Sequence, residues 1–482
     1  MPAKQVLSGI SIFVHLEFII LTLTMPSTSK PLYFILITFF IVFAISFLGN
    51  SFTLMGIKFN NINILSDVLP AESEDTSQMI QPLVQIEVAD SIPDYRSSTE
   101  IIGYEEEGVL KAFIRALKDL RDGKRAKVRI AYFGDSMIEG DLVTQDVRKS
   151  FQDYFGGNGV GFVPITSIVA GFRQTIQHSF SESWQDEHFL NTSLARSGSI
   201  FLSGHRFRPG EGSSVSYLGV NRSHLGKFSE CYLLYGRVDS TGTFSVNDSV
   251  QGYKYNSHFN RQLVSIDQQR IYARFGGHQN EIYGFSFESP RGVFVDNFSF
   301  RGISGTELQK ISEEMLMSVN EAQPYDLIII QYGPNLLFKP DLIDFRWYEK
   351  PFERAVATLK RTFPKASILI VGSADKATKY DGEYKTQKGV LPLIEIQNKV
   401  AYETKTNFWS LYNAMGGKNS MIRWVHSSPP LANLDYTHLT HKGATTVARL
   451  LFDKLIQVYD PEAASRSQIQ PIVRYVAVSR GI

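Results

Sequence analysis

The feature that most constrains the fold is an alternation of short apolar runs with longer helical patterns. Runs with the length of a buried strand lie at 128–134, 325–333 and 366–375, and helical patterns lie at 137–154, 348–363, 393–404 and 441–459. A further helical stripe, built on Phe113, Leu117 and Leu120, precedes the first run and places the start of folded structure near Gly103. Strands that alternate with helices predict an α/β fold, with a parallel sheet covered on both faces by helices.

The texture of the sequence changes between about residues 175 and 297. This stretch is rich in Gly, Ser, Tyr and Phe and contains short alternating runs such as SIFLSGHRF, ECYLLYGRV and EIYGFSFES. We expect an inserted β-rich domain over 175–297, most simply a sandwich, which separates a first part of the α/β domain at 101–174 from a second part at 298–460. Four aromatic residues of the insert could stack on sugar rings or instead belong to its core: Trp184, Tyr253, Tyr255 and Phe259.

The N-terminal region, residues 1–59, reads as a membrane anchor or signal region. Residues 31–49 form an uncharged apolar run, long enough to cross roughly 30 Å of hydrocarbon as a helix. Translation could start at Met1 or at Met25, and Lys30 before the span predicts that the rest of the chain is exported. We expect an uncleaved anchor with the catalytic domain on the periplasmic or extracellular side; cleavage would give a secreted protein.

Two segments lack sustained periodicity. Residues 60–100 mix acidic, Ser, Thr and Pro residues, which predicts a disordered tether between membrane and folded domain. Residues 461–482 are taken as a C-terminal tail.

Charge and cysteine usage exclude several classes of protein. The formal net charge is +1, from 49 basic and 48 acidic side chains, so no global field draws the chain to nucleic acid. The single cysteine, Cys231, excludes an intramolecular disulfide and a multi-cysteine metal site, and is best read as an inert buried residue. No clustered metal ligands and no Walker-type motif are evident, so we expect no cofactor.

Ser136 is the candidate nucleophile. It lies in Gly134-Asp135-Ser136, where the first predicted strand ends and its helix is expected to begin. Such a position exposes a side chain at the carboxyl edge of a parallel sheet, close to helix N–H groups. The same three residues would also serve as an ordinary turn and N-cap, so the tripeptide alone is weak evidence.

Asp435 and His438 form the second candidate element. Their three-residue spacing brings a carboxylate and an imidazole to one side of a turn, so Asp435 could orient His438 and leave the other ring nitrogen free to take a proton from a serine. A surface ion pair is the alternative reading.

Two further loops could stabilise a tetrahedral intermediate. Gly305, in Arg301-Gly302-Ile303-Ser304-Gly305, could offer an unobstructed backbone N–H, and the Asn335 amide, after Gly333-Pro334, could donate to an oxyanion. Taken singly, Gly305 would be a turn glycine and Asn335 a cap residue. Arg173 and Trp424 could line the same pocket.

The order of these blocks resembles that of the SGNH/GDSL hydrolases. The GDS block, the block at Gly305, the GxN block at Asn335 and the DxxH block match the family pattern over 127–167 and 296–453. The resemblance implies a three-layer α/β/α fold and esterase, lipase or deacetylase activity. It implies Ser136 as nucleophile, His438 as base and Asp435 as its orienting partner, with an oxyanion hole made by the N–H groups of Ser136 and Gly305 and the side chain of Asn335.

The chain departs from the family pattern at two positions. Leu336 stands where many members carry an acidic residue, and Pro334 fills the variable position before Asn335. Both bear on loop shape more than on the proton path. A β module in this place is similar to the architecture of exported peptidoglycan O-acetylesterases.

These observations lead us to expect an exported, membrane-tethered serine esterase that removes a small acyl group, such as acetyl, from a cell-envelope or extracellular glycan, which could be peptidoglycan. Acyl transfer and lipid-ester hydrolysis on the same scaffold are the enzymatic alternatives, and a non-catalytic glycan-binding envelope protein is a third.

Overall fold

The computed structural model describes residues 52–54, 57–59, 95–191, 200–238, 242–277 and 280–462. The chain forms two units, 1–87 and 88–482. In the first, β1 (Phe52–Leu54) pairs antiparallel with β2 (Ile57–Phe59). The predicted span at 31–49 and the tail beyond residue 462 lie outside the described residues. Within the described part of the chain, every helix is too short or too polar to cross a bilayer.

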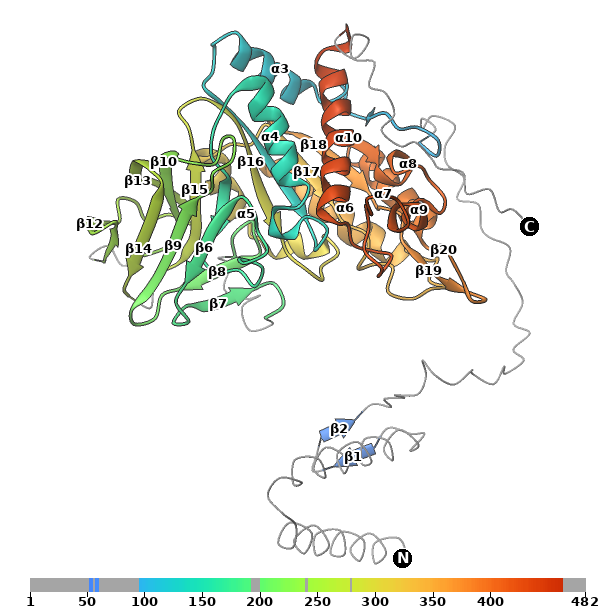
Figure 1. Ribbon diagram of the computed structural model, residues 1–482, viewed down its shortest axis with the longest axis horizontal. Coiled ribbons are helices and arrows are strands. Elements are labelled where there is room, and N and C mark those ends of the chain that lie inside the picture. Colours follow the sequence, from blue (N-terminus) through green and yellow to red (C-terminus); the bar gives the residue numbers. More distant parts are fainter. Residues whose placement is uncertain are drawn as a thin grey trace, which may run out of the picture. The chain divides into compact units, whose positions relative to one another are not determined.

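A six-stranded sheet in the order β16-β4-β17-β18-β21-β3 organises the second unit (Figure 1). The first five strands run parallel, and β3 pairs antiparallel with β21 at the edge. The strands are β3 (Ile102–Gly103), β4 (Lys127–Gly134), β16 (Gly292–Ser299), β17 (Leu327–Gln331), β18 (Ser367–Gly372) and β21 (Asn407–Ser410). The mixed α/β fold with a parallel sheet that the sequence predicts is confirmed.

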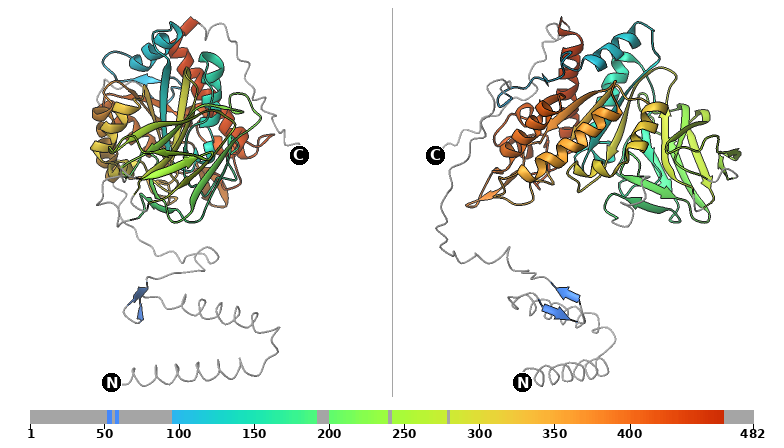
Figure 2. Two further views of the ribbon diagram at one scale, coloured as in Figure 1. Left: turned by 90° about the vertical axis from the view of Figure 1, so that its left-hand side faces the viewer. Right: turned by 180° about the vertical axis from the view of Figure 1, so that it is seen from behind.

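Helices cover both faces of this sheet because side chains alternate along its strands (Figures 1 and 2). On β17, Ile328 and Ile330 pack with α5, α6 and α7, whereas Leu327 and Ile329 pack with α3, α4 and α10. The helices are α3 (Lys111–Arg121), α4 (Thr144–Phe155), α5 (Glu313–Ala322), α6 (Arg346–Thr362), α7 (Val390–Glu403), α8 (Leu411–Ala414), α9 (Ser420–Val425) and α10 (His441–Tyr459), with 3-10 turns η1 (Glu139–Asp141) and η2 (Thr306–Lys310). A short hairpin, β19 (Ala377–Tyr380) and β20 (Glu383–Thr386), stands apart from the sheet.

The segment between α4 and β16 forms two antiparallel sheets that share one apolar core, drawn in green in Figure 1. One sheet has the order β13-β10-β15-β8-β7, with β5 also paired to β15, and the other has the order β12-β11-β14-β9-β6. The strands are β5 (Gly161–Pro164), β6 (Ile176–Phe180), β7 (Gln185–His188), β8 (His205–Arg208), β9 (Ser213–Gly219), β10 (Phe228–Tyr235), β11 (Thr243–Val246), β12 (Ser249–Gly252), β13 (Asn260–Gln268), β14 (Arg270–Phe275) and β15 (Ile282–Glu288).

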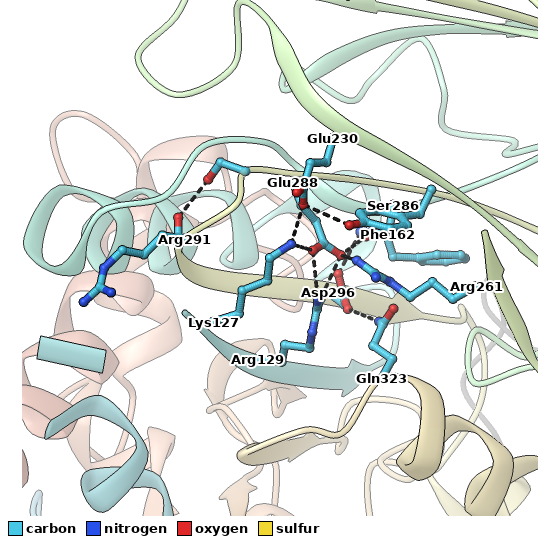
Figure 3. Close-up of polar contacts among 12 residues, drawn as sticks. Lys127, Arg129, Phe162, Glu230, Arg261, Ser286, Glu288, Arg291, Asp296 and Gln323 are labelled. Carbon is cyan, nitrogen blue, oxygen red and sulfur yellow. Dashed lines mark hydrogen bonds and ion pairs between the residues drawn. The ribbon is translucent and has the colours of Figure 1, made fainter. Parts of the chain in front are cut away.

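A buried ionic network joins these strands to the parallel sheet (Figure 3). The Glu288 carboxylate on β15 is fully buried and accepts hydrogen bonds from Lys127 and Arg129 of β4, at 2.7–2.8 Å, and from Arg261 of β13 at 2.7 Å. Lys127 also pairs with Glu230 of β10. These cations hold the pKa of Glu288 well below its usual value although burial opposes ionisation. The strand that leads to the candidate nucleophile is thereby fixed to the insert.

Two local expectations need correction. The helix expected at 137–154 begins at Thr144, because Gly140, Asp141 and Val143 adopt positive φ angles of 67°, 69° and 64°, which a helix cannot accommodate. Residues 95–100, expected within the tether, belong to the folded unit: Tyr95 is buried, and the Asn413 amide donates to the carbonyl oxygens of Tyr95 and Ser98 at 2.9 and 2.8 Å.

Candidate active site

Ser136 lies at the carboxyl end of β4, the second strand of the parallel sheet. The turn that presents it is built locally. A Cβ on Gly134 would lie 2.8 Å from the Ile138 side chain, so only glycine lets the chain turn this tightly. The Asp135 carboxylate then accepts the N–H of Met137 at 2.9 Å and closes the turn around Ser136.

Asp435 and His438 lie on one turn ahead of α10. One oxygen of Asp435 accepts the backbone N–H groups of Thr437 and His438 at 3.0 and 2.9 Å, and the other lies 2.7 Å from Nδ1 of His438. Burial raises the pKa of Asp435, but the hydrogen bonds from His438 and Thr437 outweigh burial and hold that pKa below its ordinary value. Asp435 is therefore an ionised acceptor for the Nδ1–H of His438.

Two segments far apart in the sequence meet at Ser136. Nε2 of His438 lies 2.9 Å from Oγ of Ser136, across 302 positions of sequence. With Nδ1–H directed to Asp435, Nε2 is the ring nitrogen able to accept the serine proton. The structure brings the three residues of the predicted triad into one hydrogen-bonded chain, open to solvent at His438, whose side chain is 41% exposed.

Gly305 and Asn335 occupy neighbouring loops. Gly305 precedes η2 with φ of 94°, and a Cβ there would lie 2.6 Å from the ring of Tyr332. The Asn335 amide donates to the carbonyl oxygen of Ile303 at 2.9 Å and to the Asp135 carboxylate at 3.2 Å. Asn335 thus ties its own loop to the other two, at the carboxyl edge of the sheet. Leu336, one of the two departures from the family pattern, is buried in the core.

Backbone donors at the site remain available. Within the described part of the chain, the N–H groups of Ser136 and Gly305 donate no hydrogen bond to a protein atom. Such N–H groups are able to bind an oxyanion that forms next to the serine.

Asp135 is a site residue whose environment the sequence does not reveal. Its side chain is fully buried, and burial raises its pKa to about 6 despite the hydrogen bond from Met137 and the nearby His438. Because its pKa is raised, the Asp135 carboxyl group changes its charge with pH, next to the candidate nucleophile and in contact with Asn335.

A cavity of about 520 Å³ opens at Ser136 and His438. Apolar side chains form part of its wall, among them Met137, Leu142 and Phe172. Glu139 and Arg301 also line it and form an ion pair, with Nε of Arg301 at 2.9 and 3.0 Å from the two carboxylate oxygens. The sequence gives no signal for this pair, because its members lie 162 positions apart.

Among the described residues, the remaining candidates from the sequence do not line the cavity at Ser136. Trp424 is buried in the apolar core and does not line the cavity at Ser136 among the described residues. Arg173 pairs instead with Asp141 at 3.1 Å. Trp184 and Phe259 are buried, Tyr253 is half-buried, and Tyr255 is 57% exposed, so they do not form an aromatic platform. Cys231 is buried in the core of the insert.

The described residues contain no group of three or more His, Cys, Asp or Glu side chains placed to hold a metal ion.

Comparison with known proteins identifies the fold. No family model and no curated protein sequence matches the chain. A solved structure of a peptidoglycan O-acetylesterase superimposes with a TM-score of 0.62 at 23% identity, covering 74% of this chain and 99% of that one. The likeness shows that the two chains share a fold.

Two further matches have TM-scores too low to support an argument. A family two carbohydrate esterase from Cellvibrio japonicus matches at 0.25, with 11% identity over 59% of this chain and 98% of that one. An acetylxylan esterase from Geobacillus stearothermophilus matches at 0.26, with 19% identity over 34% of this chain and 73% of that one.

Proposed function

We propose that this chain is a serine esterase that removes O-acetyl groups from a glycan. The observation that carries the proposal is the hydrogen-bonded chain from Ser136 through His438 to Asp435, with distances of 2.9 and 2.7 Å, at the carboxyl edge of the parallel sheet. A serine hydroxyl is a weak nucleophile unless a base removes its proton, and this arrangement supplies an oriented base.

The reaction follows from the positions of these groups. Oγ of Ser136 attacks the acetyl carbonyl carbon while Nε2 of His438 takes its proton, and the carbonyl oxygen becomes an oxyanion. The N–H groups of Ser136 and Gly305 are the donors available to that oxygen. The Asn335 amide holds the surrounding loops through Ile303 and Asp135 and would act as a third donor by releasing one of these two bonds. His438 then protonates the departing sugar oxygen, and water hydrolyses the acetyl-enzyme with His438 again as base.

Two observations that do not involve Ser136, His438 or Asp435 support the substrate class. The structure of similar fold is that of a peptidoglycan O-acetylesterase, which makes O-acetylated peptidoglycan the first substrate to test. The apolar run at 31–49 favours a membrane anchor with the catalytic domain on the periplasmic or extracellular side, where such a glycan is found.

Hydrolysis of an aryl acetate by the full chain, purified in detergent, tests the proposal. Ser136→Ala should abolish turnover while circular dichroism stays unchanged. Equal activity in both proteins would refute the assignment. Assaying acetate release from O-acetylated peptidoglycan against acetyl transfer to an added sugar separates hydrolysis from the acyltransferase alternative.

A further inference from the structure

A second cavity adjoins the one at Ser136. Its volume is about 270 Å³, and Glu139, Val169 and Arg301 line both cavities. The rest of its wall comes mainly from η1, from β5 and the loop after it, from β6, β7 and β8 of the insert, and from the end of β16. It is therefore bounded by the parallel sheet and the insert together. Its volume is close to the lower end of the range of roughly 300–1,000 Å³ seen for small-molecule sites, which suits a single ring.

The charged groups of this wall are paired with one another. Asp141 is fully buried and bound by Arg148 at 2.8 Å and Arg173 at 3.1 Å. Asp186 lies 2.8 Å from Nδ1 of His205, and Glu139 pairs with Arg301. Since each of these carboxylates already has a partner, the wall presents no free carboxylate to a ligand.

Neutral hydrogen-bonding groups do remain unused. Ser203 is 4% exposed, and its Oγ has no hydrogen-bond partner within the described part of the chain. A buried hydroxyl without a partner is unfavourable, so a ligand hydroxyl that hydrogen-bonds to it would relieve that cost. Nδ1 of His188 accepts the N–H of Leu190 at 3.3 Å, which leaves Nε2–H as a donor.

Apolar surface completes the wall. Phe300 packs against two imidazoles, with its ring centroid 4.9 Å from that of His205 and 5.8 Å from that of His188. Phe162 and Pro164 add further apolar contact. Apolar faces combined with scattered hydroxyl and imidazole groups suit a pyranose, whose C–H face is apolar and whose hydroxyls both donate and accept.

We propose that this second cavity is a subsite for one neutral sugar residue of the glycan, next to the acetylated residue at Ser136. The proposal rests on the proposed function, because it assigns the neighbouring position along the same substrate. It predicts that the enzyme acts on oligosaccharides better than on single acetylated sugars.

Binding tests the subsite without turnover. The full chain carrying Ser136→Ala would be titrated by calorimetry with a neutral N-acetylglucosamine tetramer and with an acidic oligogalacturonate. We expect the neutral tetramer to bind and the acidic one to bind more weakly. Adding Ser203→Ala should raise the Kd for the neutral tetramer about threefold to tenfold, the loss of one hydrogen bond. The matched control is Ser179→Ala, an exposed serine on β6.

A second variant tests the exposed side of the cavity. Ile168 is 79% exposed and lines the cavity, so Ile168→Trp should narrow it with little risk to folding and should also weaken binding. An unchanged Kd in both variants, or no binding by the parent protein, would overturn the subsite.

Kinetics separate this proposal from the proposed function. If the protein hydrolyses aryl acetate but does not bind the tetramer, the subsite is refuted and the esterase assignment stands. If it binds the tetramer but does not hydrolyse aryl acetate, the esterase assignment is refuted. Ser203→Ala should lower kcat/KM on an acetylated oligosaccharide relative to aryl acetate. If Ser203→Ala changed the ratio of kcat/KM for aryl acetate to kcat/KM for aryl octanoate, the cavity would be assigned to an acyl chain and the sugar assignment would be overturned.

Discussion

The Asn335 amide donates a 3.2 Å hydrogen bond to the carboxylate of Asp135, the residue that directly precedes Ser136. A fully buried carboxyl group therefore lies next to the candidate nucleophile and accepts a hydrogen bond from a residue of the proposed oxyanion loop. The protonation state of Asp135 therefore bears on both stability and loop geometry.

Asp135 should make stability depend on pH in a defined direction. Its pKa of about 6 in the folded state lies above the ordinary value of 3.8, so the folded protein binds more protons between these values. The contribution of Asp135 to the free energy of unfolding is largest below about pH 4 and falls as pH rises through 6. A difference of about 2 pH units corresponds to a free energy on the order of 3 kcal/mol. Urea unfolding should show that, between pH 4 and pH 7, the free energy of unfolding of the wild type falls relative to that of Asp135→Asn. A difference between the two proteins that is the same at both pH values would contradict this.

Asp435→Asn should lower kcat by about 10²–10⁴-fold, because an amide in its place no longer fixes the His438 tautomer that accepts the serine proton. The fold should persist, since the side chain is half exposed. Aryl acetate kinetics measure the loss, with the exposed Asp122→Asn as control. Activity close to wild type would exclude Asp435 as the orienting partner.

Gly305→Ala and Gly302→Ala form a matched pair. Both glycines have positive φ, 94° and 80°, so each alanine meets a backbone cost of about 1–2 kcal/mol. Only at position 305 would the new Cβ meet the Tyr332 ring, whereas nothing lies within 4 Å at position 302. Denaturant unfolding should show Gly305→Ala as the less stable of the two. Equal stabilities would mean that Tyr332 moves freely.

Tyr384 on β20 should act as a positioning residue for the Asp435–His438 turn. Its ring stacks on Tyr436 with centroids 3.7 Å apart, and Tyr436 holds a φ of 55° that side chains rarely adopt. Tyr384→Ala should lower kcat about threefold to tenfold with little change in KM, in line with an aromatic pair worth about 0.5–1.5 kcal/mol.

Tyr384→Phe keeps the ring and should restore the rate. A loss in Tyr384→Phe equal to that in Tyr384→Ala would show that stacking is not the cause.

Glu288→Gln should destabilise the fold by about 3–5 kcal/mol, because Lys127, Arg129 and Arg261 would lose their shared buried partner. Urea unfolding of the variant beside the exposed Glu211→Gln measures the effect. A loss below about 1 kcal/mol would show that the network is dispensable.

The sequence predicts the elements whose signal is local. The runs that became β4, β17 and β18 are continuous and apolar, and Ser136, Asp435 and His438 lie at turns marked by short motifs. The sequence does not predict the helix start at Thr144, because two of the positive-φ positions before it, Asp141 and Val143, are not glycine.

Contacts between distant residues could not be predicted. Glu139 with Arg301 and Glu288 with Arg129 pair across 162 and 159 positions, and no periodicity joins them. Composition also leaves the place of the insert's aromatic residues open, because a ring on a strand looks the same in sequence whether it faces the core or solvent.

The strand order has a consequence for how the protein is made. β4, which leads to the candidate nucleophile, pairs with β16 and β17, so Lys127 lies opposite Gly292 and Ile130 opposite Leu327. A growing chain therefore releases the whole insert before β4 can find either neighbour, and until then both edges of an apolar strand are open to pairing with other chains. Contacts so far apart in sequence close slowly, so the insert must be synthesised before β4 can gain either neighbour.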